Sequence, residues 1–171
     1  MTPTKIDLLL NCNWIIPIVP ENQTLADCAI AIDNGKIIGL LPQAEAARKF
    51  SAGKVQDLDH HIVMPGLVNS HGHAAMSLLR GYADDLPLRS WLENHIWPAE
   101  AKFLSEEFVR DGTRLSIAEM IRSGTTCFAD MYFFDEAIAT EVRNSGVRSQ
   151  ISFTVLDFPT PYGKNADDYI H

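Results

Sequence analysis

The sequence predicts an α/β protein in which a small β-rich unit, residues 1–59, is followed by strand–helix repeats over residues 60–171. Short strand patterns and a hairpin turn fill the first part. In the second part, apolar strand runs alternate with helix patterns in the order β-α-β-α-β, which implies parallel strands joined by right-handed crossovers. The chain has 171 residues, whereas a closed (β/α)8 barrel typically needs about 250. Two architectures are therefore open: a three-stranded α/β domain, and the front part of a longer barrel.

The β-rich unit is predicted from alternation and turn chemistry. Apolar side chains at positions 6, 8 and 10 alternate with Asp7, Leu9 and Asn11, which is a half-buried strand pattern with one apolar exception at Leu9. The dipeptide Asn34-Gly35 favours a type I′ turn because both of its residues tolerate positive φ. We therefore expect strands at residues 6–10, 29–33, 36–40 and 55–59, and a short alanine-rich helix at residues 42–50.

The strand–helix part begins with residues 62–68, an apolar run with β-branched side chains that predicts a strand buried on both faces. Ser105 can cap a helix that ends at Ser123, because Gly124 supplies the left-handed residue that follows many helices. The buried face of this helix is expected to be an apolar stripe: Phe108, Leu115, Ala118 and Ile121. The remaining predicted elements are a strand at 125–130, a helix at 135–144 capped by Asp135, and a strand at 147–155.

Composition excludes several function classes. The formal net charge is −8 and the sequence has no basic run, so neither nucleic acid nor an anionic membrane is an expected partner. No apolar stretch approaches the roughly 18 residues of a membrane span, and the N-terminus lacks a signal-peptide core, so a cytoplasmic protein is expected. Cys12, Cys28 and Cys127 show no metal or disulfide spacing and are expected to be free thiols.

The sharpest chemical feature is Asn69-Ser70-His71-Gly72-His73, placed at the end of the predicted strand 62–68. In an extended segment, side chains two residues apart project to the same side. Two imidazoles so placed can bind one cation, and the carboxyl end of a barrel strand is where such folds keep their chemistry. The spacing alone is weak, because histidines two apart also occur on solvent faces. Asp130 ends the second strand at the same edge, where it could act in the site or fix neighbouring loops by hydrogen bonds.

Several ordered motifs resemble one known family. They are residues 63–73, VMPGLVNSHGH; residues 76–81, MSLLRG; residues 96–100, IWPAE; and residues 124–132, GTTCFADMY. Together they resemble the amidohydrolase superfamily, and within it the 5-methylthioadenosine/S-adenosylhomocysteine deaminases, which are related to chlorohydrolases and guanine deaminases. The resemblance implies the N-terminal portion of a (β/α)8 metal-dependent hydrolase barrel, with a small flanking β-sandwich-like unit.

The resemblance also implies roles for individual residues. His71 and His73 would bind one divalent metal ion, with Zn2+ expected and Fe2+ or Ni2+ compatible with the same ligands. Glu100 would bind the ribose hydroxyls of a nucleoside, although it could be a solvated residue near a helix start. Trp91 would wall the pocket, although a packing role is nearly as good an account of a tryptophan. The catalytic acid–base residues and the remaining metal ligands are expected after residue 171, so none lies within this chain, which alone is expected to be inactive.

The expected reaction is hydrolytic deamination of the adenine ring of 5-methylthioadenosine, S-adenosylhomocysteine or adenosine, by a homo-oligomer. Relatives carry an arginine on the third strand where this chain has Phe153, which leaves the substrate open. One alternative is another aminohydrolase or a chlorohydrolase, with a guanine, pyrimidine or triazine substrate. An alternative of another class is a non-catalytic α/β metal-binding or assembly subunit.

Overall fold

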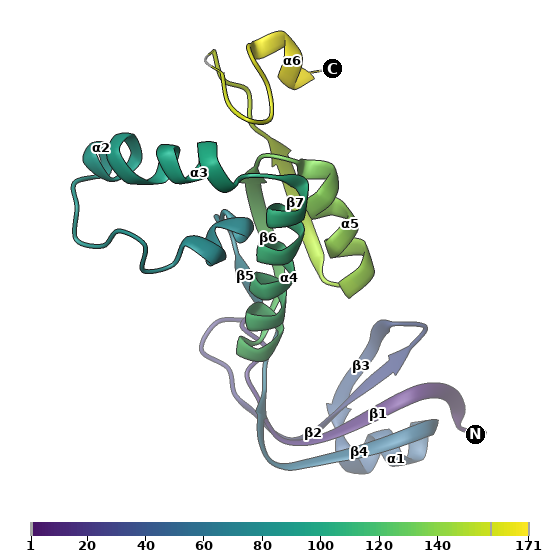
Figure 1. Ribbon diagram of the computed structural model, residues 1–171. Coiled ribbons are helices and arrows are strands. Elements are labelled where there is room, and N and C mark those ends of the chain that lie inside the picture. Colours follow the sequence, from purple (N-terminus) through teal and green to yellow (C-terminus); the bar gives the residue numbers. More distant parts are fainter. Residues whose placement is uncertain (1, 158, 171) are drawn as a thin grey trace. The chain divides into compact units, whose positions relative to one another are not determined.

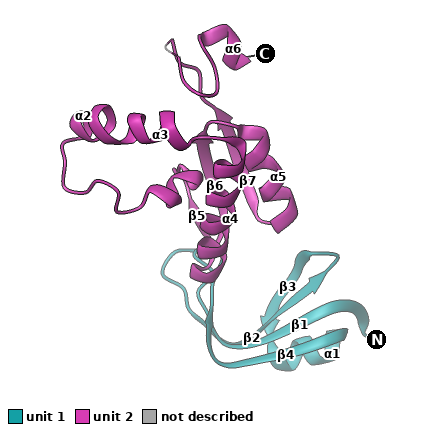
Figure 2. Cartoon of the chain, viewed as in Figure 1, with its two compact units in different colours: residues 1–65 teal, residues 66–171 magenta. Residues whose placement is uncertain are grey.

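The computed structural model describes residues 2–157 and 159–170 (Figure 1). The chain forms two compact units, residues 1–65 and residues 66–171 (Figure 2). The first unit contains these elements: β1 (Thr4–Ile15), β2 (Leu25–Asp33), β3 (Lys36–Pro42), α1 (Gln43–Lys49) and β4 (Phe50–Val63).

The first unit is one four-stranded sheet in the order β3-β2-β1-β4, with β1 and β4 parallel and the other pairs antiparallel. The predicted hairpin is confirmed: Asn34 and Gly35 have φ values of 48° and 71°, as a type I′ turn requires. Helix α1 buries Ala46 in a core that contains Ile6 and Phe50. The described residues of this unit form a single sheet, so they do not show the second layer of a β-sandwich.

The predicted strand at 62–68 is wrong as a single element. Strand β4 ends at Val63 and belongs to the first unit, whereas β5 (Leu67–Asn69) belongs to the sheet of the second. Pro65 separates the two, because proline lacks the N–H that a sheet ladder requires. The expected division after residue 59 thus falls inside β4, and the contacts divide the chain after Pro65 instead. Leu67 and Val68 are also exposed rather than buried on both faces.

The second unit contains the predicted strand–helix alternation. Its helical elements before the second strand are η1 (Ala74–Leu79), α2 (Leu88–Trp91), η2 (Leu92–Ile96), α3 (Trp97–Phe103) and α4 (Glu106–Ser123). It continues with β6 (Thr125–Tyr132), α5 (Asp135–Ser145), β7 (Arg148–Phe153) and α6 (Ala166–Ile170). Strands β5, β6 and β7 form one parallel sheet in that order, which confirms the predicted β-α-β-α-β succession.

Helix α4 begins and ends where the sequence predicts. The Ser105 hydroxyl accepts a hydrogen bond from the Phe108 N–H at 3.1 Å, and Gly124 follows the helix with φ 86°. The predicted buried stripe is wrong, since Leu115 and Ile121 are 40% and 55% exposed. The residues that α4 buries are instead Val109, Gly112, Thr113 and Ile117.

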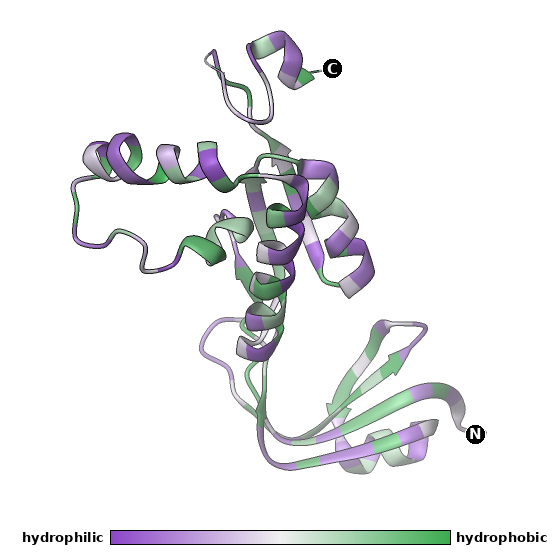
Figure 3. Cartoon of the chain, viewed as in Figure 1, coloured by the Kyte–Doolittle hydropathy of each residue, from purple (hydrophilic) through white to green (hydrophobic). Residues whose placement is uncertain are grey.

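Close packing against η1 explains which face of α4 is buried. A Cβ added to Gly112 would lie 2.3 Å from the carbonyl oxygen of Ala75, so only glycine permits this approach. Hydropathy does not mark a glycine as a buried contact residue. The buried face predicted from the larger apolar side chains of α4 therefore lies to one side of the face that is observed to be buried. Figure 3 shows purple and green residues alternating along α4 and α5, as in helices with one solvent face.

Helix α5 differs from the prediction at its start. Phe134, with φ 54°, occupies the N-cap position, and Asp135 lies in the first turn, where a carboxylate complements the helix dipole. Its end at Gly146, with φ 75°, agrees with the predicted stop. Among the described residues, no helix is long and apolar enough to cross a membrane.

Candidate metal and substrate site

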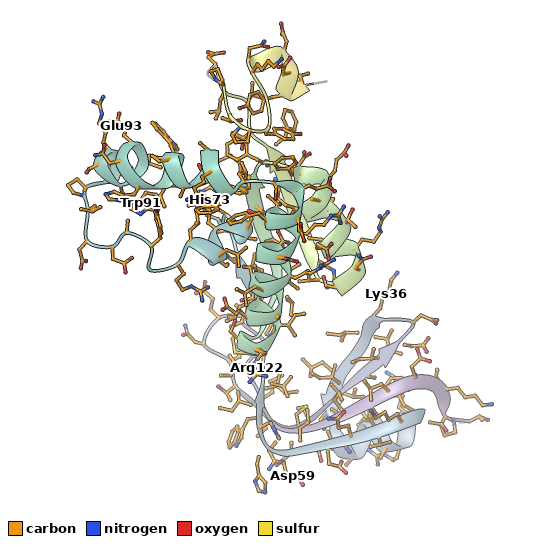
Figure 4. All side chains as sticks on the ribbon, in the orientation of Figure 1. Lys36, Asp59, His73, Trp91, Glu93 and Arg122 are labelled. Atoms are coloured by element: carbon orange, nitrogen blue, oxygen red, sulfur yellow. The ribbon has the colours of Figure 1, made fainter. Side chains whose placement is uncertain are left out.

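Three hydrogen bonds attach the segment after β5 to the end of β6. The Met131 N–H donates to the Gly72 carbonyl at 3.3 Å, and the Ala74 N–H donates to Asp130 Oδ1 at 3.0 Å. Between them, His73 Nδ1 lies 2.6 Å from the Met131 carbonyl oxygen. The two histidines therefore follow β5 at the carboxyl edge of the parallel sheet, as the sequence predicts. Figure 4 labels His73.

The bond to Met131 fixes the tautomer of His73. A carbonyl oxygen only accepts, so Nδ1 must carry the proton and Nε2 keeps its lone pair. A backbone carbonyl behind the ring is a common support for a metal-ligating histidine. The ring of His71 has its centroid 5.1 Å from that of His73, with the planes at 82°. This donor pair fits a divalent ion of the zinc type, which binds imidazole nitrogen.

Asp130 anchors the histidine segment. Its side chain is only 2% exposed, and Oδ1 accepts hydrogen bonds from the N–H groups of Ala74 and Met131, both at 3.0 Å. Burial raises the pKa of this carboxyl, which the two backbone donors and nearby His73 oppose. Of the two roles left open by the sequence, the contacts match the fixing of neighbouring loops. Within the described part of the chain, Asp130 Oδ2 has no hydrogen-bond partner.

Glu100 lies on α3 and contacts the end of β6. The hydroxyl of Tyr132 donates to Glu100 Oε1 at 2.6 Å, and the Tyr132 side chain is 5% exposed. Burial raises the pKa of Glu100, while the tyrosine hydroxyl and the electrostatic interaction with His73 act in the opposite direction. Burial and the same hydrogen bond raise the pKa of Tyr132, so it keeps its proton. Glu100 is thus a half-buried carboxylate within electrostatic reach of His73, rather than a freely solvated residue.

A cavity of about 260 Å³ lies beside Glu100. Its lining includes Trp97 of α3, Leu104 directly after α3 and Phe133 directly after β6, and the segment 159–161 completes it. Trp91, the residue that the sequence suggested as a pocket wall, is half-buried at the end of α2 and is not among the described residues that line this cavity. Its role in substrate binding stays a prediction.

His71 and His73 are the candidate metal donors that the described residues bring together. Over residues 2–157 and 159–170, no group of three or more His, Cys, Asp or Glu side chains is arranged to hold a metal ion. A catalytic zinc site usually has three protein ligands and an open position. A zinc site that used His71 and His73 would therefore need at least one further protein ligand.

Comparison with known families and proteins decides the relationship. Residues 62–170 match the amidohydrolase family. The chain belongs to the amidohydrolase family. This confirms the resemblance inferred from the ordered motifs, and the α/β fold described above is the one that amidohydrolases of known structure share.

The curated relatives include deaminases. A 5-methylthioadenosine/S-adenosylhomocysteine deaminase of Teredinibacter turnerae is 49% identical over 168 residues, covering 98% of this chain and 38% of the relative. A 5′-deoxyadenosine deaminase of Methanococcoides burtonii is 42% identical over 151 residues, covering 88% of this chain and 34% of the relative. This amidohydrolase chain thus spans little more than a third of the length of either relative.

Solved structures with a similar fold include a deaminase and a chlorohydrolase. An adenosine deaminase from Xanthomonas campestris with bound zinc is 44% identical, with a TM-score of 0.95 over 99% of this chain and 38% of that one. An atrazine chlorohydrolase from Arthrobacter aurescens, complexed with zinc, is 22% identical with a TM-score of 0.77, covering 89% of this chain and 36% of that one. The second likeness shows the fold alone.

Sequence reasoning gave no role to Tyr132, although the residue lies in a quoted motif. Phe128, Asp130 and Tyr132 alternate as the buried positions at the end of β6. Two polar groups at buried alternating positions of a strand need hydrogen-bond partners. That alternation was the available signal, whereas their partners Ala74 and Glu100 could be identified only from the fold.

Proposed function

We propose that the full-length protein carrying this chain is a metal-dependent deaminase of adenine nucleosides such as 5-methylthioadenosine, S-adenosylhomocysteine or adenosine. The observation that carries the proposal is the His71–His73 pair, in which the Met131 carbonyl holds Nδ1 of His73 and so leaves Nε2 of that ring as a donor. The names of the relatives, at 42% to 49% identity, support the choice of substrate class.

In this proposal, His71 and His73 supply two imidazole ligands to one divalent ion, with zinc as the expected metal. A bound ion of this kind supplies Lewis-acid chemistry that activates water at neutral pH. The Met131 carbonyl holds the ring of His73 so that Nε2 is presented as the donor, and Asp130 holds the segment that carries it. The remaining ligands and the acid–base groups would come from the portion of the relatives' length that this chain does not span.

Glu100 would bind the ribose. An ionised carboxylate accepts hydrogen bonds from vicinal hydroxyls, and its place near His73 would orient the adenine ring toward the metal. Strands β5 to β7 would be the first three of a (β/α)8 barrel, with the first unit flanking it. A cytoplasmic homo-oligomer with Trp91 at the substrate pocket is part of the same proposal.

Product release by the metal-loaded full-length protein tests the proposal, measured as ammonia for the amino-substituted substrates and as chloride for the chlorotriazine. The panel contains 5-methylthioadenosine, S-adenosylhomocysteine, adenosine, 5′-deoxyadenosine, guanine and a chlorotriazine. We expect turnover of the adenine nucleosides. Turnover of guanine or chlorotriazine alone would support the alternative aminohydrolase or chlorohydrolase, and a protein that turns over none would support the non-catalytic alternative.

Metal content tests the ligand assignment separately from activity. His71→Gln and His73→Gln should each lose most of the bound metal, measured by atomic emission on the purified full-length protein. His61→Gln is the matched control, because His61 lies on β4 of the first unit. Retention of a full metal equivalent by both site variants would contradict the assignment.

A further inference from the structure

The contact between Tyr132 and Glu100 joins two elements that are distant in sequence. Tyr132 ends β6, Glu100 lies in the middle of α3, and their oxygens are 2.6 Å apart. This length is at the short end for a bond to an ionised acceptor, where hydrogen bonds are strongest. Since the hydroxyl reaches only Oε1, Oε2 makes no hydrogen bond with the described residues.

The tyrosine itself is firmly held. Its ring packs against Phe133, with centroids 5.2 Å apart, and its side chain belongs to the main hydrophobic core of the second unit. The ring also lies 6.3 Å from that of His73, so one rigid side chain lies beside both the proposed metal ligand and the proposed ribose ligand. Glutamate, in contrast, has three rotatable bonds whose freedom is lost when it binds.

We propose that Tyr132 is a positioning residue for nucleoside binding: its hydroxyl holds Glu100 Oε1 so that Oε2 is presented to the ribose. The inference rests on the proposed function, because it assigns Tyr132 an action on the ribose contact of Glu100. Ordering the carboxylate before the ligand arrives reduces the cost of binding, which is the general effect of preorganisation. Tyr132 acts through Glu100 and needs no contact with the reacting atoms.

Binding of a deaminated nucleoside tests this without turnover. Dissociation constants of inosine and 2′,3′-dideoxyinosine are measured by titration calorimetry on the full-length metal-loaded protein and on Tyr132→Phe, which removes only the hydroxyl. We expect inosine to bind about 10- to 100-fold more weakly to the variant, the range for a hydrogen bond to a charged group. Binding of dideoxyinosine should be nearly unchanged, because it has no hydroxyls for Glu100 to accept from.

The ratio of the association constants of inosine and dideoxyinosine separates positioning from damage, since both ligands are measured on the same sample. Tyr162→Phe is the matched control: it removes another tyrosine hydroxyl that donates to a carboxylate, Asp135, at 3.2 Å. Its ratio should match that of the unmodified protein. If Tyr132→Phe does not fold, Glu100→Asp provides the second test, because the shorter side chain cannot keep both contacts and should lower the ratio.

Three outcomes are distinguishable. If Glu100→Gln lowers the ratio and Tyr132→Phe does not, the positioning role is wrong while the ribose role of Glu100 stands. Equal weakening of both ligands by Tyr132→Phe also overturns the inference, because it indicates general damage. If Glu100→Gln itself leaves the ratio unchanged, the ribose contact in the proposed function is wrong.

Discussion

At the scale of single residues, the geometry around His73 depends on backbone groups. The Met131 carbonyl selects the tautomer, and the Ala74 N–H is held by Asp130. Both contacts come from the end of β6, so the position of the histidine pair depends on the register between β5 and β6. The chemistry of the pair therefore depends on residues that a search for ligand types alone would omit.

Gly112→Ala should destabilise the protein. The added Cβ would lie 2.3 Å from the carbonyl oxygen of Ala75, so α4 and η1 must separate. Overpacking of this kind costs about 1–3 kcal/mol, which we expect as a lower Tm in thermal unfolding followed by circular dichroism. Gly53→Ala is the control, since its Cβ would meet only ordinary contacts, the nearest at 3.4 Å. Equal Tm values for the two variants would contradict the packing account.

Glu141 should stabilise the pairing of α4 with α5. It is 5% exposed and receives hydrogen bonds from Arg114 at 2.8 Å and 3.1 Å and from Arg110 at 3.0 Å. Glu141→Gln should cost about 1–3 kcal/mol at neutral pH, the range for hydrogen bonds to a charged group. Glu119→Gln, which affects an exposed pair with Arg80, is the control and should change Tm little.

The pH dependence of the Glu141 effect follows from its pKa. The hydrogen bond from Arg114, aided by Arg110, lowers the folded-state pKa below the ordinary value of 4.5. The ionised carboxylate therefore stabilises the fold fully above pH 4.5, and this contribution is lost as the pH falls through the lowered folded pKa. The Tm difference between the unmodified protein and Glu141→Gln should shrink on acidification below pH 4.5. A difference that grows there would contradict the ion-pair account.

At the scale of elements, α4 shows how capping sets the ends of a helix. The Ser105 hydroxyl satisfies one of the first N–H groups, and Gly124 takes the left-handed conformation after the last turn. Helix α5 begins differently, because Phe134 takes the positive φ and leaves Asp135 in the first turn. An acidic residue at a helix start can thus occupy the N-cap or lie in the first turn, and only the backbone conformation distinguishes these two positions.

Ser105→Ala should lower stability by about 1 kcal/mol, because the Phe108 N–H loses its acceptor. Ser105→Asp should keep the cap and add a favourable charge at the helix N-terminus, so its Tm should be close to that of the unmodified protein. Both are measured by thermal unfolding. An alanine variant with the same Tm as the unmodified protein would contradict the capping role of Ser105.

The helical segment from α2 to α3 contains a π-helical turn, η2, between Trp91 and Trp97. A π turn widens the helix and changes which side chains share a face, and such turns are frequent at functional sites. Trp97 and Glu100 of α3 and Leu104 directly after it line the cavity, whereas Trp91 lies before the π turn. Regular α-helical spacing would therefore predict the wrong position for Trp91 relative to Glu100.

At the scale of the whole molecule, the three-stranded sheet has open edges in this chain. Leu67 and Val68 of β5 are 50% and 66% exposed, and Phe153 of β7 is 55% exposed. Exposed apolar edge strands promote association with other chains. The chain also spans only 38% of the length of the Teredinibacter relative.

The 171-residue polypeptide, produced by itself, should therefore self-associate at micromolar concentration, as measured by sedimentation velocity. Val68→Lys should reduce the association, because a lysine on an edge strand opposes edge-to-edge pairing. Val19→Lys is the control, because Val19 is 79% exposed but lies in the first unit, outside both sheets. A monomeric unmodified polypeptide would contradict this expectation.

The sequence by itself determined the features that depend on local chemistry. These were the Asn34-Gly35 turn, the cap at Ser105, the stop at Gly124, the parallel strand–helix order and the family motifs around His71 and His73. Each depends on conformations or spacings that neighbouring residues impose on one another. The family followed as well, because its motifs are contiguous in the chain.

Only the tertiary structure decided what depends on contacts between distant segments. It divided residues 62–68 between two sheets, rotated the buried face of α4 toward Gly112, and brought Tyr132 to Glu100 and Asp130 to the segment after His73. The physical reason is that burial and hydrogen bonding of these groups are properties of the space between elements. Hydropathy and spacing along one element do not contain the position of its partner.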